Sequence, residues 1–127
     1  MKIRNSLVSN SSSCSFIITN KSNKQLTIVD FVKENPQLIE KFKELYDLYK
    51  SYPTFTQENL IKSAQVRLDE KPHTNDGISN YIIPPKSHRH LIFGDEHGDV
   101  IGHVFDYILR DSGESEHFTW EFDEMLR

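Results

Sequence analysis

The sequence contains one cysteine, Cys14, among its 127 residues, which excludes any disulfide within the chain. A lone thiol is typical of proteins in a reducing compartment, so we expect a cytoplasmic protein. Apolar runs are short as well: none is longer than about four residues, whereas a membrane-spanning helix needs about 20. Polar serines follow Lys2 and Arg4 where a secretory signal peptide requires an apolar segment, so no such signal is expected.

The chain has only five glycines, and none of them lies in the serine-rich residues 9–15. Loops that hold phosphate through backbone N–H groups rely on glycine, so this run of hydroxyls favours a turn over an anion site. A Gly-x-Ser-x-Gly nucleophile elbow and a His-Glu-x-x-His zinc motif are absent too. Cys14 with a distant histidine could supply a nucleophile, but no motif indicates this chemistry.

Basic residues are scarce in the second half of the chain. Residues 1–64 carry nine Lys/Arg and six Asp/Glu, whereas residues 65–127 carry six Lys/Arg and thirteen Asp/Glu. Between Asp95 and Glu124, ten acidic residues are accompanied by one base, Arg110. Nucleic-acid phosphates are bound by clustered Lys/Arg, so direct nucleic-acid binding is disfavoured here. A protein partner with a basic surface fits better, and a solvated acidic face without a partner is the alternative.

Three helices are predicted in the first half of the chain. Thr27 and Asp30 form a capping box before a helix over residues 28–35, and Pro36 begins a second helix over residues 36–51. Apolar residues recur on one face of that second helix at Leu38, Phe42, Leu45 and Tyr49. Thr54 or Thr56 caps a third helix that ends at Leu68.

Residues 88–122 form the most regular part of the sequence. A short apolar strand ends at Phe93, Asp99 caps a helix over residues 99–110, and Phe118, Trp120 and Phe122 then alternate as a buried strand face. With strands at residues 15–19, 81–83, 90–93 and 117–122, these elements predict an α+β fold. We expect one domain over residues 1–127, with a small, mainly antiparallel sheet packed against about four helices. The composition is compatible with a flexible segment over residues 1–14 and predicts a loop over residues 69–80.

One segment resembles a known sequence signature. Residues 4–16 read Arg-Asn-Ser-Leu-Val-Ser-Asn followed by a serine run and Phe16. This is similar to an N-terminal signature, roughly Arg-x-Gly-Phe-Val-Ser-Asn, a serine run and Phe, of many uncharacterised phage and bacterial proteins. Ser6 replaces the usual glycine, Leu7 replaces the usual phenylalanine, and Cys14 interrupts the serines. The resemblance covers about a tenth of the chain; it implies a phage-type origin and carries no catalytic residue.

Histidines and acids around residues 88–103 could hold a divalent metal. His88 and His90 would point to one side of a strand, and Asp95 and His97 follow in the next turn, with His103 one helical turn further on. Imidazole and carboxylate ligands suit Zn²⁺, Mn²⁺ or Fe²⁺, and such a site would make the protein a metal-dependent hydrolase. Exposed polar residues around a hairpin are the alternative interpretation.

Acidic residues of the second half are the candidate partner-binding surface, and they are Asp95, Glu96, Asp99, Glu114 and Glu116. Glu121 and Asp123 fall on one strand face, which is more simply the solvent side of the strand than a pair of catalytic carboxylates. We therefore expect a phage-type protein that binds a host or viral protein, for example as an inhibitor of a nucleic-acid-handling or defence protein. The alternatives are the metal-dependent hydrolase and a structural role in virion assembly.

Overall fold

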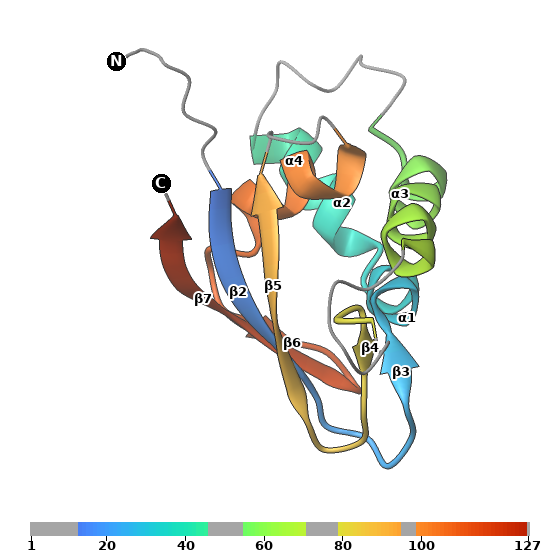
Figure 1. The fold of residues 1–127 in the computed structure, drawn as a ribbon. Helices are drawn as coiled ribbons and strands as arrows, with labels where there is room; N and C mark the ends of the chain where they lie inside the picture. Colours follow the sequence, from blue (N-terminus) through green and yellow to red (C-terminus); the bar gives the residue numbers. More distant parts are fainter. Residues whose placement is uncertain (1–12, 46–54, 71–78, 95–98, 127) are drawn as a thin grey trace.

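The computed structural model describes residues 13–45, 55–70, 79–94 and 99–126 of the chain (Figure 1). A four-stranded antiparallel sheet has the order β5-β2-β7-β6, with bounds β2 (Ser13–Asn20), β5 (His88–Gly94), β6 (Gly113–Glu114) and β7 (Phe118–Leu126). A second sheet pairs β3 (Leu26–Thr27) with β4 (Ile82–Ile83). Four helices lie on one side of the larger sheet: α1 (Ile28–Glu34), α2 (Gln37–Leu45), α3 (Gln57–Asp69) and α4 (Val100–Ile108). The predicted α+β fold is confirmed.

The central strand is β2, which pairs antiparallel with β5 on one side and with β7 on the other. Cys14, Phe16 and Ile18 alternate along it and are fully buried on the side that the helices cover. The strand begins at Ser13, two residues earlier than predicted, so Ser13 and Cys14 do not belong to a flexible segment. Pairing with strands on both sides overrides the weak strand preference of serine.

The helices begin where their caps predict. The Thr27 side chain accepts a hydrogen bond from the backbone N–H of Asp30, and the Asp30 carboxylate accepts one from the Thr27 N–H, so the capping box of α1 is confirmed. Thr56 caps α3, and α2 begins after Pro36. Residues 46–51 of the predicted second helix and residues 71–78 of the predicted loop lie outside the described residues. The two-residue strands β3 and β6 were not predicted, because neither contains an apolar run such as the Tyr81-Ile82-Ile83 run that predicted β4.

A β-bulge interrupts the pairing of β7 with β2. Ser15 pairs with Glu124 and Phe16 pairs with Phe122, so Asp123 is the extra residue on β7. The Asp123 carboxylate accepts a hydrogen bond from the Ser15 hydroxyl at 3.1 Å, which ties the bulge to the central strand.

The buried face of β7 ends earlier than its alternation predicts. Phe118 and Trp120 are buried, but Phe122 is 40% exposed, so the prediction that Phe122 belongs to the buried face was wrong. Within the described ranges, β6 flanks β7 only at Thr119 and Trp120. The second half of β7 is therefore an edge of the sheet, where Phe122 has a neighbouring strand on one side only.

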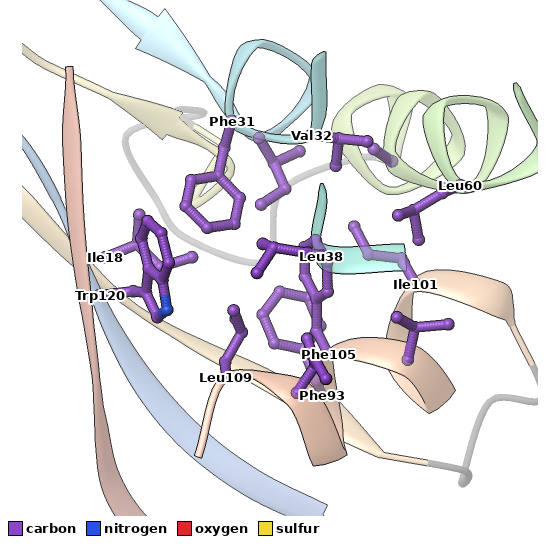
Figure 2. Packing of buried hydrophobic residues seen from close by; sticks show 14 of the residues in the cluster. Ile18, Phe31, Val32, Leu38, Leu60, Phe93, Ile101, Phe105, Leu109 and Trp120 are labelled. Atoms are coloured by element: carbon purple, nitrogen blue, oxygen red, sulfur yellow. The ribbon is translucent and has the colours of Figure 1, made fainter. Parts of the chain in front are cut away.

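Phe31 of α1 lies at the centre of the core, between the helices and the sheet (Figure 2). Its ring meets those of Phe105, Phe118 and Trp120 nearly edge-on, with centroid separations between 5.2 and 5.6 Å. Edge-to-face contacts of this kind are favoured by the charge distribution of aromatic rings. Because truncating a buried phenylalanine typically costs about 3–5 kcal/mol, this cluster firmly couples α1 to α4 and β7.

An ion pair between the buried Arg67 and the half-buried Asp99 joins α3, α4 and β5. Nε and Nη2 of Arg67 donate to the two carboxylate oxygens of Asp99 at 2.7 and 3.0 Å. Its Nη1 donates to the carbonyl oxygen of Ile92 at 2.7 Å and to the Tyr81 hydroxyl at 3.2 Å. Burial on its own would lower the pKa of Arg67, but Asp99 and Tyr81 outweigh burial and raise that pKa above its ordinary value. The guanidinium is thus a fixed charge in the interior.

Asp99 is also the N-cap of α4, as predicted, because its Oδ1 accepts a hydrogen bond from the Gly102 N–H at 3.2 Å. No side chain fits at position 102. A Cβ there would lie 2.4 Å from Oδ1 of Asp99 and 2.5 Å from the carbonyl oxygen of Gly94. Glycine is therefore required for α4 to pack this closely against the end of β5.

Breaking this ion pair should strongly destabilise the fold. We expect Arg67→Met and Asp99→Asn each to lower the free energy of unfolding by about 3–5 kcal/mol. Asp99→Asn leaves the buried guanidinium without its counter-charge, and Arg67→Met leaves the half-buried Asp99 carboxylate and the Ile92 carbonyl oxygen without their donor. Urea denaturation followed by circular dichroism measures this loss. Lys62→Met, on the exposed side of the same helix, is the matched control and should change the free energy by less than about 1 kcal/mol. Equal stability of Arg67→Met and the control would contradict the prediction.

Candidate functional site

Four exposed glutamates gather on the β6–β7 hairpin and along β7. The side chains of Glu114 and Glu116 are 72% and 82% exposed, and Glu121 and Glu124 are exposed as well. We call Glu114, Glu116, Glu121 and Glu124 the acidic edge. It lies at the edge of the sheet opposite β5.

Few cations balance the acidic edge. Lys21 Nζ lies 3.0 Å from a carboxylate oxygen of Glu114, and a pair this exposed contributes at most about 1 kcal/mol. Glu116 lies 3.7 Å from the ring Nε2 of its neighbour His117. Throughout the described ranges, no Lys or Arg side chain comes within 4.0 Å of the carboxylates of Glu116, Glu121 or Glu124. The acidic edge therefore presents net negative charge to solvent.

The turn of the hairpin is held by Glu34, at the last position of α1. One carboxylate oxygen of Glu34 accepts a short hydrogen bond from the Ser115 hydroxyl and another from the His117 N–H at 3.0 Å. The other oxygen lies 2.6 Å from Nδ1 of His117. Asn35, the buried C-cap of α1, donates to the Ser115 hydroxyl at 3.3 Å. These contacts give the turn between the two strands a fixed position on α1.

The surroundings of Glu34 favour its ionised form. Burial raises the pKa of Glu34, but the hydrogen bonds from Ser115 and His117, together with the charge of a protonated His117, outweigh burial. The pKa of Glu34 consequently lies below its ordinary value. At neutral pH the anchor is a carboxylate, and each contact with Ser115 and His117 is charge-assisted.

The predicted partner-binding residues divide between two regions. Glu114 and Glu116 lie on the exposed hairpin, whereas Asp99 lies elsewhere and both of its oxygens are bound to Arg67. Asp99 therefore has a structural role, and we do not include it in the acidic edge. Asp95 and Glu96 lie outside the described residues.

The histidines of the predicted metal site are partly separated. His88 and His90 lie side by side on β5, with ring centroids 5.5 Å apart. His103 instead contacts the ring of Phe42 on α2, with centroids 5.9 Å apart. Asp95 and His97 are not among the described residues. In the part of the chain that the structure describes, no group of three or more His, Cys, Asp or Glu side chains is arranged to hold a metal ion.

Ser15, Asp123 and His90 meet on the open face of the sheet without forming a nucleophilic triad. The Ser15 hydroxyl donates to Oδ2 of Asp123, and Nε2 of His90 lies 4.0 Å from that same oxygen. In a triad the histidine lies between the hydroxyl and the acid, where it can take the proton. Here the Asp123 carboxylate lies between the Ser15 hydroxyl and the His90 ring. These contacts therefore stabilise the bulge, and the histidine is not placed to take the proton of Ser15.

Cys14 is in a poor position to act as a nucleophile. Its side chain is fully buried, and burial together with Asp106 raises the pKa of the Cys14 thiol to about 11. Asp106 is itself fully buried and accepts from Nη2 of Arg110 at 3.3 Å. Because the thiolate is the reactive form, the thiol is both protonated and shielded at neutral pH.

Sequence patterns did not identify Arg67 or Glu34. Arg67 lies three residues after Ala64 on the inward face of α3, and a charge at such a position is the available signal that it has a buried partner. Glu34 gives no comparable signal, since its contacts are 81 and 83 residues away in the sequence.

Comparison of the chain with protein-family models, with curated proteins and with solved structures finds no match. Among the described residues, every helix is too short or too polar to cross a membrane. The site must therefore be interpreted from its own geometry.

The Glu34 anchor predicts a pH-dependent contribution to stability. A carboxyl whose pKa is lowered by folding stabilises the fold above its unfolded pKa of about 4.3, and this contribution is lost as the pH falls through the folded pKa. Glu34→Gln should therefore lower the free energy of unfolding by about 1–3 kcal/mol at pH 7. The difference between the variant and the original protein should shrink as the pH falls through the lowered folded pKa of Glu34.

Urea denaturation between pH 3 and pH 7 tests this difference. Glu44→Gln, an exposed position on α2, is the control and should behave like the original protein at every pH. A difference between Glu34→Gln and the original protein that is constant with pH would show that Glu34 stabilises the hairpin independently of its ionisation.

The Cys14 thiol should be unreactive in the folded protein. At pH 8 we expect iodoacetamide to modify it at least about 100-fold more slowly than in the urea-unfolded chain, because burial and the raised pKa both suppress the thiolate. Mass spectrometry follows the reaction without ambiguity, since the chain has one cysteine. Equal rates in the folded and unfolded chain would overturn this prediction and reopen nucleophilic chemistry at Cys14.

Proposed function

We propose that the protein acts by binding a partner protein with a basic surface through the acidic edge. The observation that carries this proposal is the grouping of four exposed glutamates on one hairpin, with Lys21 as the only Lys or Arg among the described residues that pairs with them. A surface of one charge sign steers oppositely charged partners and rejects partners of like charge.

The anchoring of the hairpin supports a binding role over a merely solubilising one. Glu34 fixes the turn, and β7 pairs with β2 along its length, so the glutamates are presented from an ordered backbone. A partner then does not have to order the backbone that carries these charges, which reduces the entropic cost of association. Solubilising charges need no such fixed arrangement.

The chemistry of the acidic edge also suggests the class of partner. A row of carboxylates can occupy Lys/Arg side chains that would otherwise contact nucleic-acid phosphates. The resemblance of residues 4–16 to phage and bacterial proteins fits the same interpretation. We therefore propose an inhibitor of a nucleic-acid-handling or defence protein as the concrete form of this function.

Affinity capture from a bacterial lysate tests the proposal. The tagged protein should retain a basic protein at low salt and release it at high salt, because screening weakens exposed charge pairs. Changing all four residues of the acidic edge from Glu to Gln should remove the capture. The matched control changes four exposed glutamates in or next to α2 and α3 to Gln, namely Glu40, Glu44, Glu58 and Glu70, and should retain it.

Mass spectrometry identifies the captured proteins for all three forms. The proposal requires a protein that the original and control forms retain and the acidic-edge variant loses. A set of captured proteins that is identical for all three folded forms would overturn it.

A further inference from the structure

A hollow of about 390 Å³ opens at the point where β6 ends beside β7. It is lined by residues of the hairpin and the segment before it: Ser112, Gly113, Glu114, Thr119, Trp120 and Glu121. Two residues of the acidic edge, Glu114 and Glu121, thus lie on its wall, and none of the lining residues is basic. The volume is near the lower end of the range for small-ligand pockets, so it suits a single side chain.

Gly113 packs directly against one edge of the Trp120 indole, and both residues line the hollow. A Cβ at position 113 would lie 2.5 Å from Cζ2 and 3.1 Å from Nε1 of Trp120, so any other residue would displace the ring or cover it. The indole is otherwise enclosed, since Trp120 is only 6% exposed and Phe31 packs against it. The hollow therefore combines the small exposed part of Trp120 with carboxylates from Glu114 and Glu121.

The indole N–H of Trp120 is a second polar group at this place. Nε1 donates no hydrogen bond to any described residue, and it is not among the fully buried side-chain atoms without a partner, so solvent can reach it. A backbone carbonyl oxygen of a bound peptide segment can replace water as its acceptor.

We infer that this hollow receives a lysine or arginine side chain of the partner, an inference that rests on the proposed function. The aliphatic stem of such a side chain packs against the indole, while its charged head reaches Glu114 and Glu121. A carbonyl oxygen of the same peptide segment accepts from the indole N–H. The edge of an indole ring is its positive part, so attraction to the carboxylates, and not a cation–π contact, selects the charge.

The existing pair between Lys21 and Glu114 does not block this binding. Lys21 does not line the hollow, and its contact with Glu114 is exposed to water. With Glu114 and Glu121 on the wall and Lys21 beside them, the local charge is still negative. An incoming cation can therefore share the Glu114 carboxylate or displace Lys21 from it at small cost.

Fluorescence of Trp120 tests the inference directly, because it is the one tryptophan in the chain. Titration with N-acetyl-arginine amide should change the emission saturably, with a dissociation constant on the order of millimolar. N-acetyl-citrulline amide has nearly the same shape without the charge and should bind at least about tenfold more weakly. The lysine analogue tests the other cationic side chain.

Two variants with equal net charge separate the hollow from the general acidity of the edge. Glu114→Gln with Glu121→Gln should weaken arginine binding at least about tenfold, whereas Glu116→Gln with Glu124→Gln should change it by no more than about twofold. Circular dichroism and the emission of the unliganded forms establish that both variants are folded. Equal binding of the arginine and citrulline compounds, no saturable response, or equal loss in both variants would overturn the inference.

Lysate capture by the four-residue acidic-edge variant and arginine titration of the original protein together distinguish failure of the inferred hollow from failure of the proposed function. If the acidic-edge variant loses the lysate partner but the original protein does not bind the arginine compound, the inference about the hollow is wrong and the proposed function stands. If arginine binds as expected but capture is insensitive to the acidic edge, the proposed function is wrong and the hollow recognises another cationic ligand.

Discussion

The pairing of Arg67 with Asp99 is the constraint on which the rest of the structure depends. A buried guanidinium is tolerated only when its donors are satisfied, and this one needs Asp99, Tyr81 and the carbonyl oxygen of Ile92 at the same time. The three groups come from the start of α4, the residues before β4 and the edge strand β5. Apolar residues replacing both Arg67 and Asp99 could contribute as much net stability, but they would not require these segments to meet in one arrangement.

The position of α4 is transmitted to the acidic edge through the core. Phe105 on α4 contacts Phe31, and Phe31 contacts Trp120, which stands beside Gly113 at the start of the hairpin. The helix α1 carries Phe31 and ends at Glu34. It therefore contacts the buried face of β7 through Phe31 and holds the turn of the hairpin through Glu34. The exposed glutamates are thus the outer side of a rigid part of the fold.

Features that depend on residues close together in the sequence could be predicted from it, whereas contacts between residues far apart in the sequence could not. Thr27 and Asp99 could be recognised as caps because a cap acts on residues three positions away. The acidic character of the C-terminal segment could also be predicted from composition. The pairing of Arg67 with Asp99 spans 32 residues and that of Glu34 with His117 spans 83, and no periodicity records such contacts. The bulge at Asp123 likewise depends on the register of β7 with β2.

Among the described residues, the second half of β7 has no neighbouring strand on its outer side, and the charge of the acidic edge affects which chains can pair there. An unpaired strand edge can add another strand of any protein, including a second copy of the same chain. The bulge at Asp123 distorts the second half of β7, and Glu121 and Glu124 on either side of it repel the equivalent residues of another copy. The same carboxylates attract a segment that carries lysine or arginine. One set of glutamates therefore opposes self-association and favours a basic partner, which is a stronger basis for selectivity than attraction alone.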